Sequence, residues 1–275
     1  MSCAIDASGL RYRYPNGVVG LDGVDLHVTH GERVAVLGPN GAGKTTLMLH
    51  LNGLLKGEGS LEVAGIRVGT GDARGLRAAV GLVFQDPDDQ LFMPTVGEDV
   101  AFGPLNLGLP RGEVHERVRA ALAAVRMEHV ADRAPHQLSL GQRRRVAIAT
   151  VLAMRPRLLV LDEPSANLDP RARRELLEVL DTIDRTMLVV THDLPFAAQL
   201  CERAVLLSGG HVAADGPCLE ILADEPLLAA HDLELPAGFD LARVSYAPAH
   251  GRRRDAPPLR LHGGGHDPQV AEVRR

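Results

Sequence analysis

A glycine-rich run near the start of the chain has the residue types needed to bind a phosphate group. The run fits G-x-x-x-x-G-K-[ST] at every fixed position, and it consists of Gly38, Pro39, Asn40, Gly41, Ala42, Gly43, Lys44 and Thr45. Glycines let several backbone N–H groups turn toward one anion. Lys44 can reach the β and γ phosphates, and the Thr45 hydroxyl can ligate Mg²⁺. We therefore expect this run to bind a nucleoside triphosphate with magnesium.

Two carboxylates follow a second apolar run. Residues 158–161 are Leu-Leu-Val-Leu, and Asp162 and Glu163 come directly after them. A buried strand here would deliver Asp162 to the edge of a nucleotide site, where it could hold Mg²⁺ directly or through water. Glu163, one residue further on, would then be placed to polarise an attacking water as a general base. The pair predicts hydrolytic chemistry once a phosphate loop lies upstream.

Short apolar runs alternate with longer amphipathic segments, which indicates an α/β fold with a mainly parallel sheet wrapped by helices. The first thirty or so residues and residues 61–68 alternate polar and apolar side chains, so we expect a smaller antiparallel sheet there. The predicted strands are 34–37, 80–84, 158–161 and 187–191, and the predicted helices are 45–55, 111–125, 142–154, 171–183 and 194–202.

The composition narrows the functional class. The formal net charge is -5, with 30 basic and 35 acidic residues, which argues against a dedicated nucleic-acid surface. The chain has 3 cysteines and no C-x-x-C pair, so we expect a reducing cytoplasmic compartment rather than a disulfide framework. No apolar stretch approaches the ~18 residues of a transmembrane helix. A role at a membrane would therefore require docking on a chain that spans it.

Leu138-Ser139-Leu140-Gly141-Gln142 identifies one family among the many nucleotide hydrolases. It resembles the LSGGQ signature of ABC ATPases and lies just upstream of the acidic strand, as in that family. Leu140 stands where glycine is usual, which affects the fine geometry and the turnover rate unless its side chain faces away from the nucleotide. A helix starting at this point suits a γ-phosphate. The resemblance covers about residues 5–225.

The resemblance assigns roles to further residues. Tyr14 is similar to the aromatic residue that stacks on adenine, and Gln85 to the Q-loop glutamine that contacts Mg²⁺ and senses the membrane partner. Asp169, in residues 165–169, is similar to the D-loop aspartate that crosses to the other subunit. His192 resembles the switch histidine that contacts the γ-phosphate. The catalytic residues implied are Glu163, His192 and Gln85; the ATP-binding residues are Tyr14, Gly38, Pro39, Asn40, Gly41, Ala42, Gly43, Lys44, Thr45, Thr46, Ser139, Gly141, Gln142 and Asp169; the Mg²⁺ ligands are Thr45, Gln85 and Asp162.

The family fold is an α/β P-loop NTPase with a RecA-like parallel core sheet, an antiparallel β subdomain and an α-helical subdomain. We accordingly expect a nucleotide-binding domain over residues 1–235, with the helical subdomain at about 86–157. Residues 236–275, which contain Arg, Pro and Gly runs, are expected to form a flexible tail. The family pairs two subunits head to tail, so that each ATP lies between the phosphate loop of one chain and the signature of the other.

Residues 85–92 (QDPDDQLF) and 95–104 (TVGEDVAFGP) resemble the Q-loop segment of energy-coupling-factor ATPases, especially cobalt and nickel importer subunits. The resemblance implies an ATPase on the cytoplasmic face of the membrane. It would work with an integral coupling protein, which inserts a helix near residues 85–102, and with a substrate-capturing membrane protein. The dimer could be of identical chains or of two related ones.

Two alternative functions stay open at this stage, and a third is disfavoured. The ATPase could serve a vitamin-uptake system of the same class, because it does not touch the cargo. It could be a soluble ABC ATPase acting on DNA or ribosomes, although such proteins usually carry coiled-coil insertions or two cassettes. A P-loop kinase acting on a metabolite would have no use for the signature segment.

Overall fold

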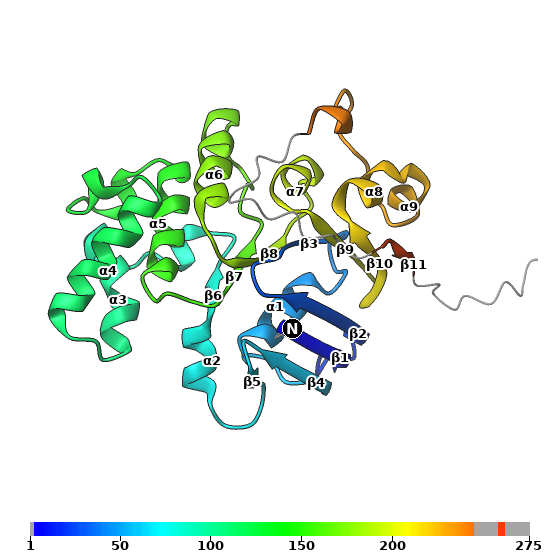
Figure 1. Cartoon of the computed structure of the whole chain (residues 1–275), viewed down its shortest axis with the longest axis horizontal. Helices are drawn as coiled ribbons and strands as arrows, with labels where there is room; N and C mark the ends of the chain where they lie inside the picture. Colours follow the sequence, from blue (N-terminus) through cyan, green and yellow to red (C-terminus); the bar gives the residue numbers. More distant parts are fainter. Residues whose placement is uncertain (1–2, 245–257, 262–275) are drawn as a thin grey trace, which may run out of the picture.

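Two β-sheets form the framework of the protein in the computed structural model, which describes residues 3–244 and 258–261 (Figure 1). The larger sheet has 7 strands in the order β11-β10-β9-β3-β8-β7-β6. Its strands are β3 (Arg33–Leu37), β6 (Val80–Val83), β7 (Leu158–Asp162), β8 (Thr186–Val190), β9 (Arg203–Ser208), β10 (His211–Pro217) and β11 (Arg260–Leu261). The pairs from β9 through β3, β8 and β7 to β6 are parallel, which confirms the predicted parallel core.

The smaller sheet has 4 antiparallel strands in the order β2-β1-β4-β5. Its strands are β1 (Cys3–Arg13), β2 (Val19–Thr29), β4 (Glu58–Val63) and β5 (Ile66–Arg67). It covers the two regions whose alternating pattern predicted an antiparallel sheet, so that prediction is confirmed.

Alternate residues of the parallel strands enter different cores. Val34 and Val36 of β3 pack in the core shared with α1 and the antiparallel sheet. Ala35 and Leu37 point to the opposite face and join a second core that the other helices complete. Successive side chains of a strand point to opposite faces, so a strand buried on both faces is apolar at every position. This explains the continuous apolar runs in the sequence.

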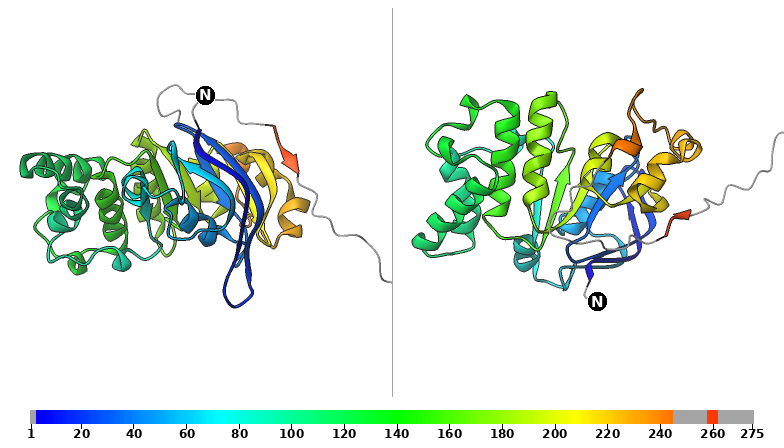
Figure 2. Two further views of the ribbon diagram at one scale, coloured as in Figure 1. Left: turned by 90° about the horizontal axis from the view of Figure 1, so that it is seen from below. Right: turned by 45° about the horizontal axis from the view of Figure 1, so that its top comes forward.

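The longer helices are α3 (Val96–Asn106), α4 (Arg111–Ala124), α5 (Leu140–Leu152) and α6 (Pro170–Thr182), and the shorter ones are α1 (Lys44–Leu51), α2 (Ala73–Ala79), α7 (Leu194–Leu200), α8 (Cys218–Ala223) and α9 (Glu225–Ala230). Helices α3, α4 and α5 pack on one another and lie at one end of the molecule, away from the antiparallel sheet (Figure 2). Their residues fall in the segment expected to form the helical subdomain.

Two helix boundaries differ from the sequence prediction for local reasons. Helix α5 starts at Leu140 instead of residue 142, because the Ser139 and Gln142 side chains form a reciprocal capping box around its first turn. Helix α1 ends at Leu51 instead of residue 55. Asn52 follows as its C-cap, and Gly53 then takes a positive φ of 73°, which glycine adopts without steric cost.

Part of the segment beyond residue 235 belongs to the described structure. Residues Leu241–Arg243 form a 3-10 turn, and β11 pairs with β10. The prediction of a flexible tail over residues 236–275 falls largely outside the described residues, and the domain boundary near residue 235 stays a prediction. In the described parts of the chain, no helix is long and apolar enough to cross a membrane.

Candidate functional site

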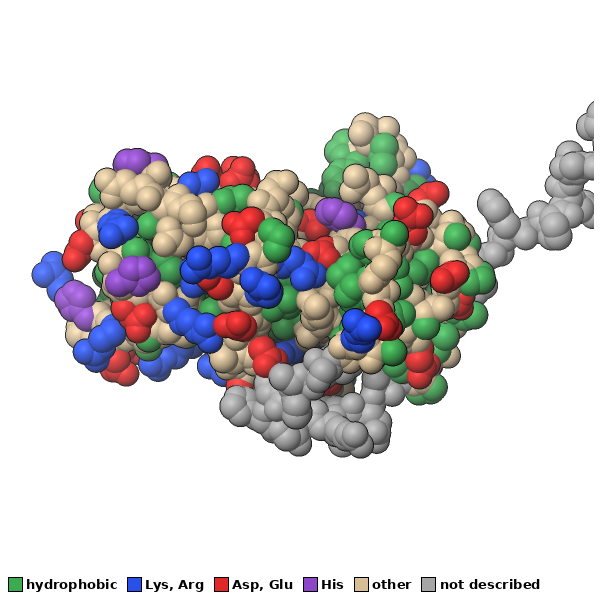
Figure 3. Space-filling model, turned by 90° about the horizontal axis from the view of Figure 1, so that it is seen from above, with side chains coloured by type: hydrophobic (Ala, Val, Ile, Leu, Met, Phe, Trp, Pro, Cys, Tyr) green, Lys and Arg blue, Asp and Glu red, His purple; other side chains and the backbone are tan. Residues whose placement is uncertain are grey.

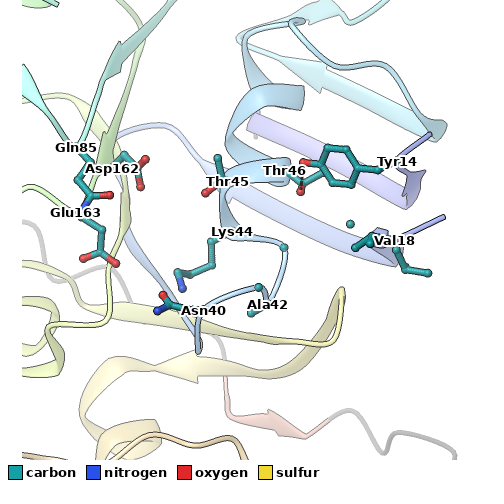
Figure 4. Close-up of a pocket in the computed structure, with 14 residues that line it drawn as sticks. Tyr14, Val18, Asn40, Ala42, Lys44, Thr45, Thr46, Gln85, Asp162 and Glu163 are labelled. Carbon is teal, nitrogen blue, oxygen red and sulfur yellow. Dashed lines mark hydrogen bonds between the residues drawn. The ribbon is translucent and has the colours of Figure 1, made fainter. Parts of the chain in front are cut away.

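A cavity of about 300 Å³ opens where the carboxyl ends of the parallel strands meet the start of α1. This edge is the usual ligand-binding edge of an open α/β sheet. Strand β3 leads into the glycine-rich loop, β6 leads toward Gln85, and β7 ends at Asp162. The lining consists of Tyr14, Val18, Val19, Gly20, Asn40, Gly41, Ala42, Gly43, Lys44, Thr45, Thr46, Gln85, Asp162 and Glu163 (Figure 4).

The glycines of the loop are needed for its backbone conformation. Gly38, Gly41 and Gly43 have φ values of 148°, 80° and 104°, which strain any residue with a side chain. A Cβ on Gly43 would also collide with the carbonyl oxygen of Gly20. Gly43 is the N-cap of α1 and makes no side-chain cap hydrogen bond. The first N–H groups of α1 therefore face the cavity as an anion-binding helix end.

Lys44 is held beside this loop by the loop itself. Its Nζ donates hydrogen bonds to the carbonyl oxygens of Gly38 at 2.7 Å and Pro39 at 2.9 Å, and the residue is 8% exposed. Burial lowers the pKa of the Lys44 amine, while the nearby carboxylates of Glu163 and Asp162 act to raise it. The ammonium group is thus positioned over the loop, where a phosphate could replace the two carbonyl partners.

Asp162 faces Thr45 across the cavity (Figure 4). Burial and the neighbouring Glu163 raise the pKa of Asp162 to about 6, against the opposing effect of Lys44 and Arg144. A divalent cation at this position would favour the ionised carboxylate. A hydroxyl, a carboxylate and the Gln85 carboxamide oxygen make up a hard donor set of the kind that Mg²⁺ uses. The three predicted ligands therefore fit a magnesium ion by location and by chemistry.

Glu163 is fixed by the segment that follows β8. The Thr191 hydroxyl donates to Oε2 at 2.9 Å, the backbone N–H of His192 donates to Oε1 at 3.1 Å, and Nδ1 of His192 lies 2.7 Å from Oε1. Glu163 also has a φ of 43°, a left-handed conformation that is uncommon away from glycine and concentrates at functional sites. His192 does not line the cavity itself, and its side chain is 62% exposed.

Tyr14 lies at the other end of the cavity, beside Thr46. Its hydroxyl and the Thr46 Oγ1 are 2.9 Å apart. Its ring meets the Tyr12 ring edge to face at 4.9 Å, and Tyr12 meets His50 in the same way at 5.1 Å. His50 is on α1, so the aromatic rings connect the end of β1 in the antiparallel sheet to the helix that follows the phosphate loop. Tyr14 is thereby positioned at the far end from Asp162, as a base-stacking residue would be.

The signature residues line a separate cavity of about 820 Å³. Ser139, Gln142 and Asp169 lie in it, together with basic side chains that sequence reasoning missed: Arg126, His129, Arg145, Arg171 and Arg174. Basic and acidic side chains lie interleaved across the face of the molecule seen from above (Figure 3). The two cavities share no lining residue, so a single chain does not bring the signature to its own phosphate loop. Gly141 lines neither cavity; its Cα faces Ala172 of α6.

Leu140, the departure from the usual signature, faces a third cavity of about 370 Å³ that Gln85 and Asn167 also line. It is absent from the lining of the cavity that contains Ser139. Leu140 is therefore on a different side of α5 from Ser139. The expectation that this side chain is tolerated if it points away from the nucleotide stays a prediction.

An ion-pair network that the sequence analysis missed joins residues 165–169 to the segment that contains His192. The Ser165 hydroxyl donates to Oδ2 of Asp193 at 2.8 Å, and Arg173 donates to both Asp193 oxygens at 3.0 and 3.1 Å. Burial alone would raise the pKa of Asp193, but these donors and the N–H of Phe196 hold it below its ordinary value. The only sequence signal was the position of Asp193 as a helix cap before Leu194-Pro195.

Comparison with known proteins finds one family and several relatives. Residues 21–166 match the family model described as ABC transporter. The chain is 48% identical to the energy-coupling factor transporter ATP-binding protein EcfA of Methanothermobacter thermautotrophicus, over 86% of this chain and 78% of that protein. It is 47% identical to the cobalt import ATP-binding protein CbiO of Rhodobacter capsulatus, over 88% and 89%. The solved structure of cbiO1 from Clostridium perfringens, described as part of the ABC transporter complex cbiONQ, matches with a TM-score of 0.76 and 36% identity, over 86% of this chain and 97% of that one.

Proposed function

Because the chain belongs to the ABC transporter family, as an ATPase of the energy-coupling-factor type, we propose that it powers uptake of a transition metal ion through a membrane partner. Cobalt or nickel is the proposed cargo. The observation that carries the proposal is that Lys44, Asp162 and Glu163 converge on one cavity at the start of α1. The relative named as a cobalt import protein supports the choice of cargo.

In the proposed site, the glycine-rich loop and Lys44 bind the phosphates of ATP, and Tyr14 stacks on the base. Thr45, Gln85 and Asp162 would hold Mg²⁺, which neutralises phosphate charge when bound. The backbone N–H groups at the start of α1 add the positive end of that helix. The positions of Tyr14 and Asp162 at opposite ends of the cavity support these roles (Figure 4).

Glu163 is the proposed general base for the attacking water. Its carboxylate is only 10% exposed, and three donors from the segment after β8 fix its direction. A base must point at the proton that it accepts. His192 is on the open side of this carboxylate, where it could contact the γ-phosphate of bound ATP.

The working form is proposed to be a two-chain dimer. Ser139, Gln142 and Asp169 line a cavity that is separate from the phosphate loop of the same chain, so these residues would act on the nucleotide of the other subunit. The start of α5 at Leu140 supports this role, because the first N–H groups of a helix favour an anion. Both halves of the composite site are present in this sequence, which makes a homodimer the simpler arrangement.

The membrane partner is proposed to dock beside α3 on the cytoplasmic face. Phe92, Phe102 and Leu105 are 62%, 41% and 51% exposed, and the two phenylalanine rings meet edge to face at 4.9 Å. Exposed apolar side chains grouped in this way favour a protein contact. An integral coupling protein would bind here, and a substrate-capturing membrane protein would complete the assembly.

Substitution of Glu163 tests the proposed chemistry. Glu163→Gln keeps the shape of the side chain and loses the base, so we expect retained ATP binding, near-complete loss of turnover, and an ATP-dependent dimer by size-exclusion chromatography. Glu116→Gln, at an exposed position of α4, is the control and should behave as wild type. Wild-type hydrolysis by the Glu163 variant would remove Glu163 from the role of base.

The cargo is tested on the membrane complex. Purification through a tag on this chain should recover two integral membrane proteins, and radioactive cobalt or nickel should accumulate in vesicles loaded with ATP. Recovery of a vitamin in place of a metal would assign the complex to a vitamin-uptake system. Recovery with nucleic acid or ribosomes, and without membrane proteins, would contradict the transport proposal.

A further inference from the structure

Arg144 is a buried cation in the second turn of α5. It is 1% exposed and is among the largest fully buried side chains of the described residues. Leu140 and Arg144 are four residues apart and therefore share one side of the helix. Both line the cavity of about 370 Å³ that also contains Gln85, Asp162 and Asn167. This side of α5 is distinct from the side with Ser139 and Gln142, which line the signature cavity.

The guanidinium group of Arg144 bridges two segments that are far apart in the sequence. Its Nη1 donates to the backbone carbonyl oxygens of Phe84, at 3.4 Å, and of Gln85. Its Nη2 donates to the carbonyl oxygen of Ala166 at 3.2 Å. The guanidinium is planar and rigid, so one group ties the backbones of residues 84–85 and of residues 165–169 to the signature helix.

The charges around Arg144 come from Asp86 and from two carboxylates of the nucleotide site. Burial lowers the pKa of Arg144, and the carboxylates of Asp86, Asp162 and Glu163 act against this effect. Its Nε is buried and has no hydrogen-bond partner. A buried cation with one donor unpaired stabilises a fold less than apolar packing of similar volume would. Folding stability alone is therefore a weak reason for an arginine at this position.

The neighbouring Arg143, whose Nε is likewise buried without a hydrogen bond, differs from Arg144 in the partners of its guanidinium group. The Arg143 side chain is 22% exposed, forms an ion pair with Asp88 at 3.1 Å, and donates to the carbonyl oxygen of Leu138 at 2.8 Å. In the described part of the chain, these partners of Arg143 lie outside residues 165–169. The two arginines are adjacent in the sequence, so they form a matched pair for substitution.

We propose that Arg144 is a positioning residue that couples three parts of the ATPase: the Gln85 loop, the signature helix α5, and residues 165–169. The inference rests on the proposed function. Gln85 lines the nucleotide cavity of its own chain, whereas Ser139 and Asp169 line the cavity assigned to the partner's nucleotide. A shift of α5 would therefore displace both segments through one guanidinium group. Arg144 touches no reacting atom; it acts through the backbones that it binds.

The test uses the full-length protein with Arg144→Met, Arg144→Lys and the control Arg143→Met. We expect Arg144→Met to lower kcat for ATP hydrolysis about 10-fold or more, with ATP affinity within about 3-fold of wild type. Arg144→Lys keeps the charge but has no planar fork to bind the carbonyl groups of Gln85 and Ala166 together. Its kcat should therefore fall between that of wild type and that of Arg144→Met. Arg143→Met should hydrolyse ATP as wild type does.

Hydrogen exchange separates coupling from a local packing defect. Amides of residues 83–86 and of residues 165–169 should both exchange faster in the Arg144 variants and not in the Arg143 variant. A change confined to one segment, or an Arg144→Met kcat equal to wild type, would overturn the inference. If the Met variant does not fold, the Lys variant decides by the same two measurements. If the wild-type protein does not hydrolyse ATP, the proposed function fails. If wild type hydrolyses ATP and Arg144→Met does so equally well, only the inference about Arg144 fails.

Discussion

Nδ1 of His192 lies 2.7 Å from Oε1 of Glu163, and the Thr191 hydroxyl donates to the other carboxylate oxygen at 2.9 Å. Glu163 follows β7, while Thr191 and His192 follow the adjacent parallel strand β8. The direction of the carboxylate is therefore set by the neighbouring strand end and not by the side chain's own torsional preference alone. Thr191 is fully buried, so its hydroxyl has a fixed place in this arrangement.

Thr191→Val should impair catalysis without impairing nucleotide binding. The substitution keeps the side-chain shape and removes the donor to Glu163, together with the acceptor of the Asp193 N–H. We expect kcat to fall about 10-fold, which corresponds to ~1.4 kcal/mol in the activation free energy, with ATP affinity nearly unchanged. Steady-state ATPase kinetics and equilibrium binding measure the two quantities. Thr186→Val, at the other end of β8, is the matched control, because that hydroxyl accepts from Gly31 and lies away from the cavity. An unaltered kcat in Thr191→Val would show that the hydroxyl does not orient the base.

Lys44→Met should weaken nucleotide binding itself. The side chain of Lys44 is already aimed along the phosphate loop by its two carbonyl partners, and Met has similar length without the charge. We expect the dissociation constant for ATP to rise about 100-fold, or ~2.7 kcal/mol, as measured by calorimetry. The chain has a second lysine, Lys56, which is exposed. Lys56→Met should bind ATP like wild type, and equal affinities in the two variants would contradict the assignment of Lys44.

His50 should make folding stability depend on pH. Its Nδ1 lies 2.7 Å from the carbonyl oxygen of Thr46, so this nitrogen carries the hydrogen, and Nε2 is buried without a partner. Burial lowers the pKa of His50. Below about pH 6.5, His50 of the unfolded chain therefore binds a proton more readily than His50 of the folded chain does. The free energy of unfolding should fall as the pH drops through this range. Above it, His50 should add nothing to the pH dependence of the free energy of unfolding.

Denaturant unfolding of His50→Gln between about pH 7 and pH 5 checks this expectation. The variant should lose less stability over the range than wild type does. His115→Gln, at an exposed position of α4, is the control and should keep the wild-type slope. An identical slope in the His50 variant would mean that other groups cause the pH dependence.

Asp99 should be needed to hold the loop that carries Phe92. Its Oδ1 accepts from the backbone N–H groups of Phe92 and Met93, both at 3.0 Å, while Oδ2 is buried without a partner. Asp99→Ala leaves both donors unpaired, so we expect a loss of ~1–3 kcal/mol in the free energy of unfolding. Asp99→Asn keeps one acceptor and should cost less.

The pH dependence of these variants gives an additional check. Burial raises the pKa of Asp99, so ionisation makes the folded wild type less stable as the pH rises past about 4. Asp99→Asn does not ionise, and its stability relative to wild type should improve as the pH rises through that range. Equal destabilisation by Ala and Asn at neutral pH would contradict the role of Oδ1 as an acceptor.

Local sequence patterns were sufficient for the parallel strands β3, β6, β7 and β8 and for the phosphate loop, because burial on both faces and a glycine-rich turn leave direct traces in the sequence. Strand β9, which is also parallel to β3, was not predicted. Helix α3 was missed for a physical reason: Gly97, Gly103 and Pro104 lower its intrinsic helix propensity. The capping box of Thr95 and Glu98 was the available signal for its start. Packing on α4 and α5 stabilises this helix despite its composition.

The arrangement of side chains around the site was less accessible from the sequence. The motifs gave the residues of the cavity, but no pattern shows that Arg144 joins Gln85 to Ala166, because the bonded residues are distant in the chain. The same is true of Asp193, Ser165 and Arg173. Which motif residues share a cavity depends on the way that α5 and α6 cross the sheet, and this is a tertiary property.

The phosphate-loop cavity and the signature cavity share no residue. In the proposed dimer, each ATP would thus be bound by the phosphate loop of one chain and by the signature residues of the other. A cell that makes a mixture of intact chains and Ser139 variants would then assemble wholly intact pairs in proportion to the square of the intact fraction. A pair of one intact chain and one variant chain keeps one complete site and loses the other. Co-expression of the two forms would therefore measure whether transport needs both sites, because a loss steeper than simple dilution means that it does.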